Sequence, residues 1–362
     1  MKKFKVGIIG ATGTVGQKFI SLLENHPWFE ISCVAASKNS AGKLFKEAVK
    51  DKWIIEKSIP ESVAQMEVLD AFRDSHQISR VCDFVFCALS TTKSETKMLE
   101  ETYAKLECPV ISNNSANRGE PDVPMIIPEL NAEHLKVIEY QKKRLGTKRG
   151  FIAVKSNCSI QCFVPAIYAL NSFEPESILV CTYQAISGAG KNFETWPEMK
   201  DNIIPFIEGE EEKSEIEPLK IWGEIQNGKI SPNSKIKITS QCLRVPVSEG
   251  HSAAVFASFK HKITIDKVKE KWENFSPHPA SVNLPSSPNK FLNYFPQPDR
   301  PQIFKDRNIH RGMGISIGRL RNDSQYDVKF VCMSHNTIRG AAGGAILLAE
   351  MLCNEKYITP KS

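Results

Sequence analysis

Short apolar runs alternate with amphipathic stretches along the first third of the chain. The runs Phe4–Ile9 and Phe29–Ala36 enclose a glycine-rich turn and a helical stretch at Gln17–Asn25. Strand, turn, helix and strand in this order predict a βαβ unit on a parallel sheet. Two further buried strands and the helix between them are predicted at Val81–Leu89, Pro109–Ser112 and Lys93–Leu106. We therefore expect a doubly wound α/β domain here.

After Arg149 the pattern changes to longer β-rich runs, with helices between only some of them. These runs are Ser177–Ala185, Lys235–Val245, Ser252–Ile265 and Tyr326–Met333. Such a pattern predicts an α+β domain with a mixed or antiparallel sheet. Seven of the 21 prolines lie in Ser276–Pro301, which we interpret as an extended surface segment. The small residues from Gly340 onward predict a closely packed helix that returns to the first domain.

Length and charge narrow the classes of protein that remain. With 362 residues, 41% of them hydrophobic, the chain can fill two globular cores. No apolar run is long enough to cross a bilayer, and we expect a cytoplasmic protein without a membrane partner. The net charge of +6 is spread along the chain, which argues against a nucleic-acid groove. The ten scattered cysteines are expected to be free thiols.

The glycine-rich turn has the spacing Gly10-x-x-Gly13-x-x-Gly16 between a strand and a helix. Such a turn lets the backbone and the helix N–H groups approach a pyrophosphate, which indicates a dinucleotide site. The second strand ends without the acid that normally holds a ribose 2′-hydroxyl. Ser37, Lys38 and Lys43 follow it instead, and a hydroxyl with two cations favours a 2′-phosphate. NADP(H) is therefore the expected cofactor.

Cys158 differs from the other cysteines because it lies between an apolar strand and a predicted helix. Orphan N–H groups and the helix dipole at such a position are expected to lower the thiol pKa and favour a nucleophilic thiolate. Among eight histidines, His251 is the best-placed general acid/base, and Arg244 is suited to bind a carboxylate. No metal-binding motif is present, so no metal is expected.

Together these blocks resemble the aspartate-semialdehyde dehydrogenase family, in its archaeal and fungal branch. The resemblance rests on five blocks in the family's order: Gly10–Gly16, Ser156–Ser159, Gln184 in Tyr183–Gly190, Arg244–His251, and Asn336–Gly344. It implies an NADPH-dependent reductive dephosphorylation of L-aspartyl-4-phosphate to L-aspartate-4-semialdehyde through a cysteine thioester, a step in lysine, threonine, methionine and isoleucine biosynthesis.

The resemblance also implies roles for individual residues. Cys158 would be the nucleophile, His251 the acid/base, and Gln184 would orient the acyl group. The substrate would be bound by Arg118, Asn157, Glu210, Lys213 and Arg244, with Glu211 as an alternative to Glu210 at the ammonium group. The coenzyme would be bound by Gly10, Thr12, Gly13, Thr14, Val15, Gly16, Ser37, Lys38, Ser40, Lys43, Ser90, Gly188 and Asn336.

The family's fold implies a Rossmann-like, doubly wound coenzyme domain over residues 1–156, completed by a C-terminal helix in 339–362. It also implies an α+β catalytic and dimerisation domain over 157–338. A homodimer or homotetramer is expected. Two alternatives use the same scaffold: a malonyl-CoA reductase, whose substrate lacks the ammonium group, and an NADP-binding regulator without catalysis. The intact Glu210–Lys213 block disfavours the first, and the presence of Cys158 and His251 disfavours the second.

Overall fold

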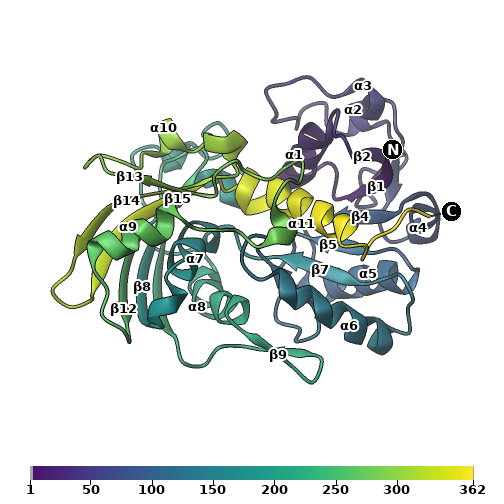
Figure 1. Cartoon of the computed structure of the whole chain (residues 1–362). Helices are drawn as coiled ribbons and strands as arrows, with labels where there is room; N and C mark the ends of the chain where they lie inside the picture. Colours follow the sequence, from purple (N-terminus) through teal and green to yellow (C-terminus); the bar gives the residue numbers. More distant parts are fainter. Residues whose placement is uncertain (1–2, 362) are drawn as a thin grey trace.

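The computed structural model describes residues 3–361, which form two sheets side by side (Figure 1). The first sheet has seven strands in the order β3-β2-β1-β4-β5-β7-β6, and all neighbours pair in parallel. Its strands are β1 (Phe4–Ile9), β2 (Phe29–Ala36), β3 (Val68–Asp70), β4 (Phe84–Cys87), β5 (Val110–Ser112), β6 (Met125–Ile126) and β7 (Ile152–Lys155). The central strands are buried, as expected for a parallel sheet covered on both faces.

Helices cover both faces of this sheet. The helices of this part are α1 (Thr14–Leu23), α2 (Phe45–Ala48), α3 (Glu61–Ala64), α4 (Ser75–Val81), α5 (Lys93–Lys105) and α6 (Ile138–Leu145). Helix α1 packs on β1 and β2, whereas α5 packs on β5 and β7. The last helix of the chain, α11 (Gly343–Asn354), also packs on β5 and β7 and contacts α1 (Figure 1). The doubly wound arrangement predicted from the sequence is therefore confirmed.

The second sheet is mixed and has the order β11-β8-β12-β15-β14-β13. Its strands are β8 (Pro175–Gln184), β11 (Lys237–Arg244), β12 (His251–Phe259), β13 (Leu292–Phe295), β14 (Ile315–Asn322) and β15 (Val328–Ser334). The helices are α7 (Ile160–Tyr168), α8 (Glu210–Ile221), α9 (Ile265–Glu273) and α10 (Ile303–Asp306), and β9 (Glu224–Gln226) with β10 (Lys229–Ser231) forms a hairpin. Helices α7 and α9 pack on this sheet and α8 packs on β11, so the α+β prediction is also confirmed.

Several element boundaries differ from the prediction, and those of α1 and β12 have local reasons. Helix α1 begins at Thr14 and ends at Leu23, before Asn25, whose φ of 58° is left-handed. Strand β12 ends at Phe259 rather than at Ile265, because Thr264 accepts a hydrogen bond from the Lys267 N–H and caps α9. A left-handed asparagine and a capping threonine therefore set these two boundaries.

The segment 276–301 consists mostly of irregular chain, with strand β13 inside it. Part of this proline-rich segment packs beside α11, and its strand β13 belongs to the second sheet. The segment therefore contacts both parts of the molecule. None of the helices within residues 3–361 has the length and apolar character needed to span a membrane.

Candidate active site

The glycine-rich loop joins β1 to α1 and leaves its backbone accessible. Gly10 has φ +89°, and a Cβ there would lie 2.5 Å from the Ala88 carbonyl oxygen. Gly16 packs directly on the Gly10 carbonyl, so both positions require glycine. A Cβ on Gly13, in contrast, would meet nothing closer than 3.5 Å. The loop also contains Thr12, Thr14 and Val15, and the N–H groups at the start of α1 are free to face an anion.

Residues expected near the adenosine phosphate follow β2 in the structure. Ser37, Lys38 and Lys43 are exposed, and Ser40 closes a turn by donating its N–H to the Ser37 carbonyl at 3.0 Å. Within residues 3–361, neither lysine has a carboxylate partner. Ser90 follows β4, which pairs with β1, so it lies at the same carboxyl edge of the sheet. These residues fit a dinucleotide with an additional phosphate.

A cavity of about 470 Å³ lies between the glycine-rich loop and the second domain. Thr14 lines it from α1, while Ser187, Gly190, Glu249 and His335 line it from the second domain. Asn336 adjoins this cavity: its side chain accepts from the Gly250 N–H at 2.7 Å and donates to Ser187 Oγ at 2.9 Å. The Asn336 side chain therefore holds two loops of the site together.

Cys158 lies two residues before α7, in the turn that follows β7. The Asn157 carboxamide oxygen accepts from the Ser159 N–H at 2.7 Å and caps this turn. A Cβ on Gly340 would lie 2.7 Å from the Cys158 Cβ, so the C-terminal segment packs directly against the cysteine. The small residues near the C-terminus thus serve close packing, as the sequence predicted.

The expected effect on the Cys158 thiol is corrected by the structure. Desolvation raises the pKa of Cys158, and the nearby Glu210 carboxylate raises it further, whereas Lys155, Arg118 and Arg244 oppose these effects. Desolvation and the Glu210 carboxylate therefore outweigh the three cations around the thiol. A thiolate at Cys158 depends on the surrounding cations.

His251 begins β12 and directs its imidazole Nε2 toward the Cys158 sulfur at 3.4 Å. The Ala185 N–H donates to the imidazole Nδ1 at 3.0 Å, so Nδ1 carries no proton. Burial, with the nearby Arg244, lowers the pKa of His251 to about 3, which keeps the ring neutral with its proton on Nε2. His251 therefore faces Cys158 as a hydrogen-bond donor.

Helix α8 places Glu210 inside this site. The Glu210 carboxylate accepts from the Asn157 side chain at 3.0 Å, from Gln184 Nε2 at 3.2 Å and from Lys213 Nζ at 2.8 Å. Glu211 instead accepts from the Cys242 N–H at 3.0 Å on β11. Of the two acids left open by the sequence, Glu210 is therefore the one that faces Asn157 and Gln184.

Two arginines approach the site from different elements. Arg244, at the end of β11, is buried and donates to the Ala185 carbonyl at 2.8 Å. Gly188 packs against it, because a Cβ there would lie 2.8 Å from an Arg244 guanidinium nitrogen. Arg118, from the loop after β5, donates to the Asn113 carbonyl at 2.9 Å, and its Nε is buried without a hydrogen-bond partner. Both arginines retain donors for a ligand.

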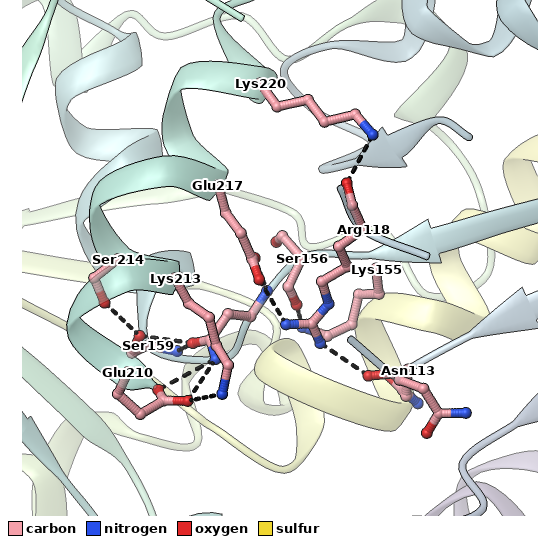
Figure 2. A network of polar contacts seen from close by, with 12 residues as sticks. Asn113, Arg118, Lys155, Ser156, Ser159, Glu210, Lys213, Ser214, Glu217 and Lys220 are labelled. Carbon is pink, nitrogen blue, oxygen red and sulfur yellow. Dashed lines mark hydrogen bonds and ion pairs between the residues drawn. The ribbon is translucent and has the colours of Figure 1, made fainter. Parts of the chain in front are cut away.

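The sequence prediction missed Glu217, which supports the site from the next turns of α8 (Figure 2). Its carboxylate accepts from Arg118 at 2.8 Å and from the Asn157 N–H at 2.6 Å. Lys220 donates to the carbonyls of Arg118, Glu120 and Val123 at 2.7, 2.6 and 2.9 Å. The spacing Glu-x-x-Lys occurs at 210–213 and again at 217–220. This repeat after seven residues is the signal that could have identified Glu217 and Lys220 from the sequence.

Among residues 3–361, no three His, Cys, Asp or Glu side chains are arranged to hold a metal ion. The chemistry available is a cysteine with an adjacent imidazole, surrounded by arginine and lysine side chains and by the carboxylates of Glu210 and Glu217.

Comparisons with known proteins cover nearly the whole chain. The family model "semialdehyde dehydrogenase, NAD binding domain" matches residues 5–138, and "semialdehyde dehydrogenase, dimerisation domain" matches 165–339. Aspartate-semialdehyde dehydrogenase of Archaeoglobus fulgidus is 39% identical over 98% of this chain and 100% of its own. The Schizosaccharomyces pombe enzyme is 41% identical over 96% of this chain and 97% of its own. The crystal structure of the Candida albicans enzyme with NADP superposes with a TM-score of 0.87 at 35% identity, covering 99% of this chain and 100% of the other.

Proposed function

Because the chain belongs to the aspartate-semialdehyde dehydrogenase family, we propose that it reduces L-aspartyl-4-phosphate to L-aspartate-4-semialdehyde with NADPH and releases phosphate. One observation carries the proposal: Cys158 Sγ lies 3.4 Å from His251 Nε2, within a shell of Arg244, Glu210 and Arg118. A nucleophile with an adjacent proton donor is suited to acyl transfer.

The charges around Cys158 complement the groups of this substrate. Arg244 has no carboxylate partner within residues 3–361 and is available for the α-carboxylate. The buried Glu210 suits the ammonium group, because Gln184 and Asn157 already fix its position. Arg118 and Lys213 provide the two cations for the phosphate. A malonyl-CoA substrate has no ammonium group for Glu210, which would keep its ion pair with Lys213 and gain no contact from the substrate.

In the proposed reaction, the Cys158 thiolate attacks the acyl carbon and the carbon–oxygen bond to phosphate breaks. The product of this step is a thioester on Cys158 and free phosphate. When bound, NADPH supplies the hydride that reduces the thioester carbon. The His251 Nε2–H then donates to the developing oxyanion, and the proton returns as the carbon–sulfur bond breaks and the semialdehyde forms.

The coenzyme is assigned to residues of the first sheet and of the facing loops. We assign the pyrophosphate to the loop from Gly10 to Gly16 and the 2′-phosphate to Ser37, Lys38, Ser40 and Lys43. We assign the nicotinamide end to Ser90, Gly188 and Asn336: Gly188 packs against Arg244 and His251, and Asn336 donates to Ser187, which lines the cavity. The coenzyme domain is proposed to span 1–156 and 339–362, because α11 packs on β5 and β7.

The second sheet supports a proposal for assembly. Along β8, β12 and β15, half-exposed apolar side chains such as Leu179, Ala254, Phe256 and Val331 face away from α7. The family model that matches this region describes a dimerisation domain. We assign this open face to the contact between two copies of the chain.

The reverse reaction tests the proposed function. Purified protein with aspartate semialdehyde, inorganic phosphate and NADP should form NADPH at a rate that depends on phosphate. A parallel assay with malonyl-CoA and NADPH should show no oxidation of NADPH. Activity with malonyl-CoA alone would overturn the substrate assignment, and inactivity in both assays would favour the non-catalytic alternative.

A further inference from the structure

Lys155 is a buried lysine for which the proposed reaction has no role. It is the last residue of β7 and is only 2% exposed. Its Nζ donates to the Ser156 carbonyl, and within residues 3–361 it makes no ion pair. Buried lysines are rare unless they are paired, because removing an ammonium group from water is costly.

Lys220 provides a comparison within the same site. It is also buried, at 6% exposure, but its ammonium donates to three backbone carbonyls. Its hydrogen-bonding capacity is therefore filled, as expected for a structural lysine. Lys155 donates to a single acceptor, so its ammonium group can still donate hydrogen bonds to an anion that forms during the reaction.

The position of Lys155 relates it to Cys158. The two residues lie at either end of the turn Ser156–Asn157, and Figure 2 shows the Lys155 side chain beside Ser156 and the Arg118 guanidinium. A Cβ on Gly344 would lie 3.5 Å from the Lys155 Cδ, so the start of α11 holds the lysine in place. A Cβ on Gly340 would lie 2.7 Å from the Cys158 Cβ, so the lysine and the nucleophile pack against the same C-terminal segment, at positions four residues apart.

A nearby cation is required to stabilise the thiolate form of Cys158. Burial and Glu210 raise the pKa of its thiol, and His251 cannot take the thiol proton because its Nε2 already carries one. Of the cations that lower the pKa of Cys158, Lys155 has the largest effect, ahead of Arg118 and Arg244. Arg118 is paired with Glu217 at 2.8 Å, and Arg244 is assigned to the substrate.

We propose that Lys155 is a positioning residue that acts through Cys158: its ammonium group is the counter-ion of the thiolate. This proposal builds on the proposed function. Cys158 loses its proton to solvent while Lys155 keeps its own, so the pair carries no net charge. In the thioester the sulfur is neutral and the ammonium has lost its partner. Lys155 therefore also favours departure of the sulfur as a thiolate when the carbon–sulfur bond breaks.

The surroundings of Lys155 determine how the pair titrates. Burial lowers the pKa of Lys155 to about 7, with Arg118 acting in the same direction and Cys158 and Glu217 opposing it. The titratable and charged groups around it are Arg118, Cys158, Glu217, His251 and Arg339. A thiolate stabilises the ammonium and the ammonium stabilises the thiolate, so the two titrations are coupled.

The pH dependence of Cys158 alkylation tests this proposal without any substrate. Iodoacetamide is reacted with the full-length enzyme across the neutral and alkaline range, and modification of the Cys158 peptide is followed by mass spectrometry. In Lys155→Met the midpoint of alkylation should rise by about one pH unit or more, which slows the reaction at neutral pH about tenfold. Lys155→Arg should keep a midpoint near that of the wild type, and Lys105→Met, on the exposed face of α5, serves as the control.

Stability distinguishes this role from a structural one. Replacing an unpaired buried lysine by methionine should leave the melting temperature unchanged or raise it. An unchanged alkylation midpoint in a folded Lys155→Met or Lys155→Gln variant would overturn the proposal. Failure of both neutral variants to fold would also overturn it, because it would show a structural role. Because alkylation needs no substrate, a shifted midpoint in an enzyme inactive with aspartate semialdehyde would overturn the proposed function alone.

Discussion

Cys158 and His251 show how individual residues divide the proposed chemistry. The imidazole is fixed by the Ala185 N–H and is kept neutral by burial, so it acts as a donor beside the sulfur. Because the pKa of His251 is lowered to about 3, its protonation should not cause a loss of activity between about pH 5 and 7. A loss of activity toward acidic pH in that range would then reflect protonation of the Cys158 thiolate or of the substrate.

Replacing Cys158 by serine tests the nucleophile. A hydroxyl does not ionise in this site, so turnover should fall by at least about a thousandfold. Coenzyme binding, measured by quenching of tryptophan fluorescence, should be retained, because Cys158 lies apart from the glycine-rich loop. Substantial remaining turnover in this variant would rule out Cys158 as the nucleophile.

Lys43 tests the coenzyme preference at the level of one side chain. Lys43→Glu places a negative charge where we assign the 2′-phosphate, so the KM for NADP should rise about tenfold. The KM for NAD should change little. An equal rise for both coenzymes would show that Lys43 does not contact the 2′-phosphate.

Helix α8 contributes side chains to the proposed substrate site and also holds a neighbouring loop in place. Its first Glu-x-x-Lys pair, Glu210 and Lys213, faces Asn157 and Gln184 in the proposed substrate site. Its second pair, Glu217 and Lys220, anchors the loop that carries Arg118. The seven-residue spacing places both pairs on one side of the helix.

Glu217→Gln tests this anchoring. Removing the charge loosens Arg118 and the Asn157 N–H, so kcat should fall by up to about a hundredfold, and the KM for phosphate in the reverse reaction should rise. Glu212→Gln, on the exposed side of α8, is the matched control. If the two variants have the same kinetics, Glu217 has no positioning role.

Among the helices and strands, the sequence predicted those with a strong hydrophobic periodicity and missed those whose pattern is interrupted. Strands β1, β2 and β8 were predicted within about two residues of their positions. Strand β14 was not predicted, because Gly318 and the left-handed Arg319 (φ 56°) interrupt its alternation and shift its register against β15. The boundary of β12 was placed too late because the capping role of Thr264 was not recognised.

The whole molecule brings the site together from both sheets. The sequence indicated Cys158, Arg244 and His251 from local patterns, but their convergence depends on long-range packing that spacing alone does not encode. The ionic environment of Cys158 was misjudged for the same reason. Helix position is visible in the sequence, whereas burial and the approach of Glu210 are not.

The open face of the second sheet gives a prediction for assembly. Ala254→Arg places a charge at the centre of this face on β12, so the assembly should dissociate to single chains. Light scattering coupled to gel filtration measures the change. Glu176→Arg, an exposed position elsewhere on β8, is the control. An Ala254→Arg variant with the same mass in solution as the wild type would show that this face is not the contact.

Trapping the thioester tests directly whether the reaction passes through Cys158. Enzyme incubated with aspartate semialdehyde and NADP, but without phosphate, should release a burst of NADPH equal to the enzyme concentration and then stop. Mass spectrometry should find one aspartyl group on the peptide that contains Cys158, and added phosphate should remove it. Absence of the burst and of any adduct, or an adduct on another residue, would contradict catalysis through a Cys158 thioester.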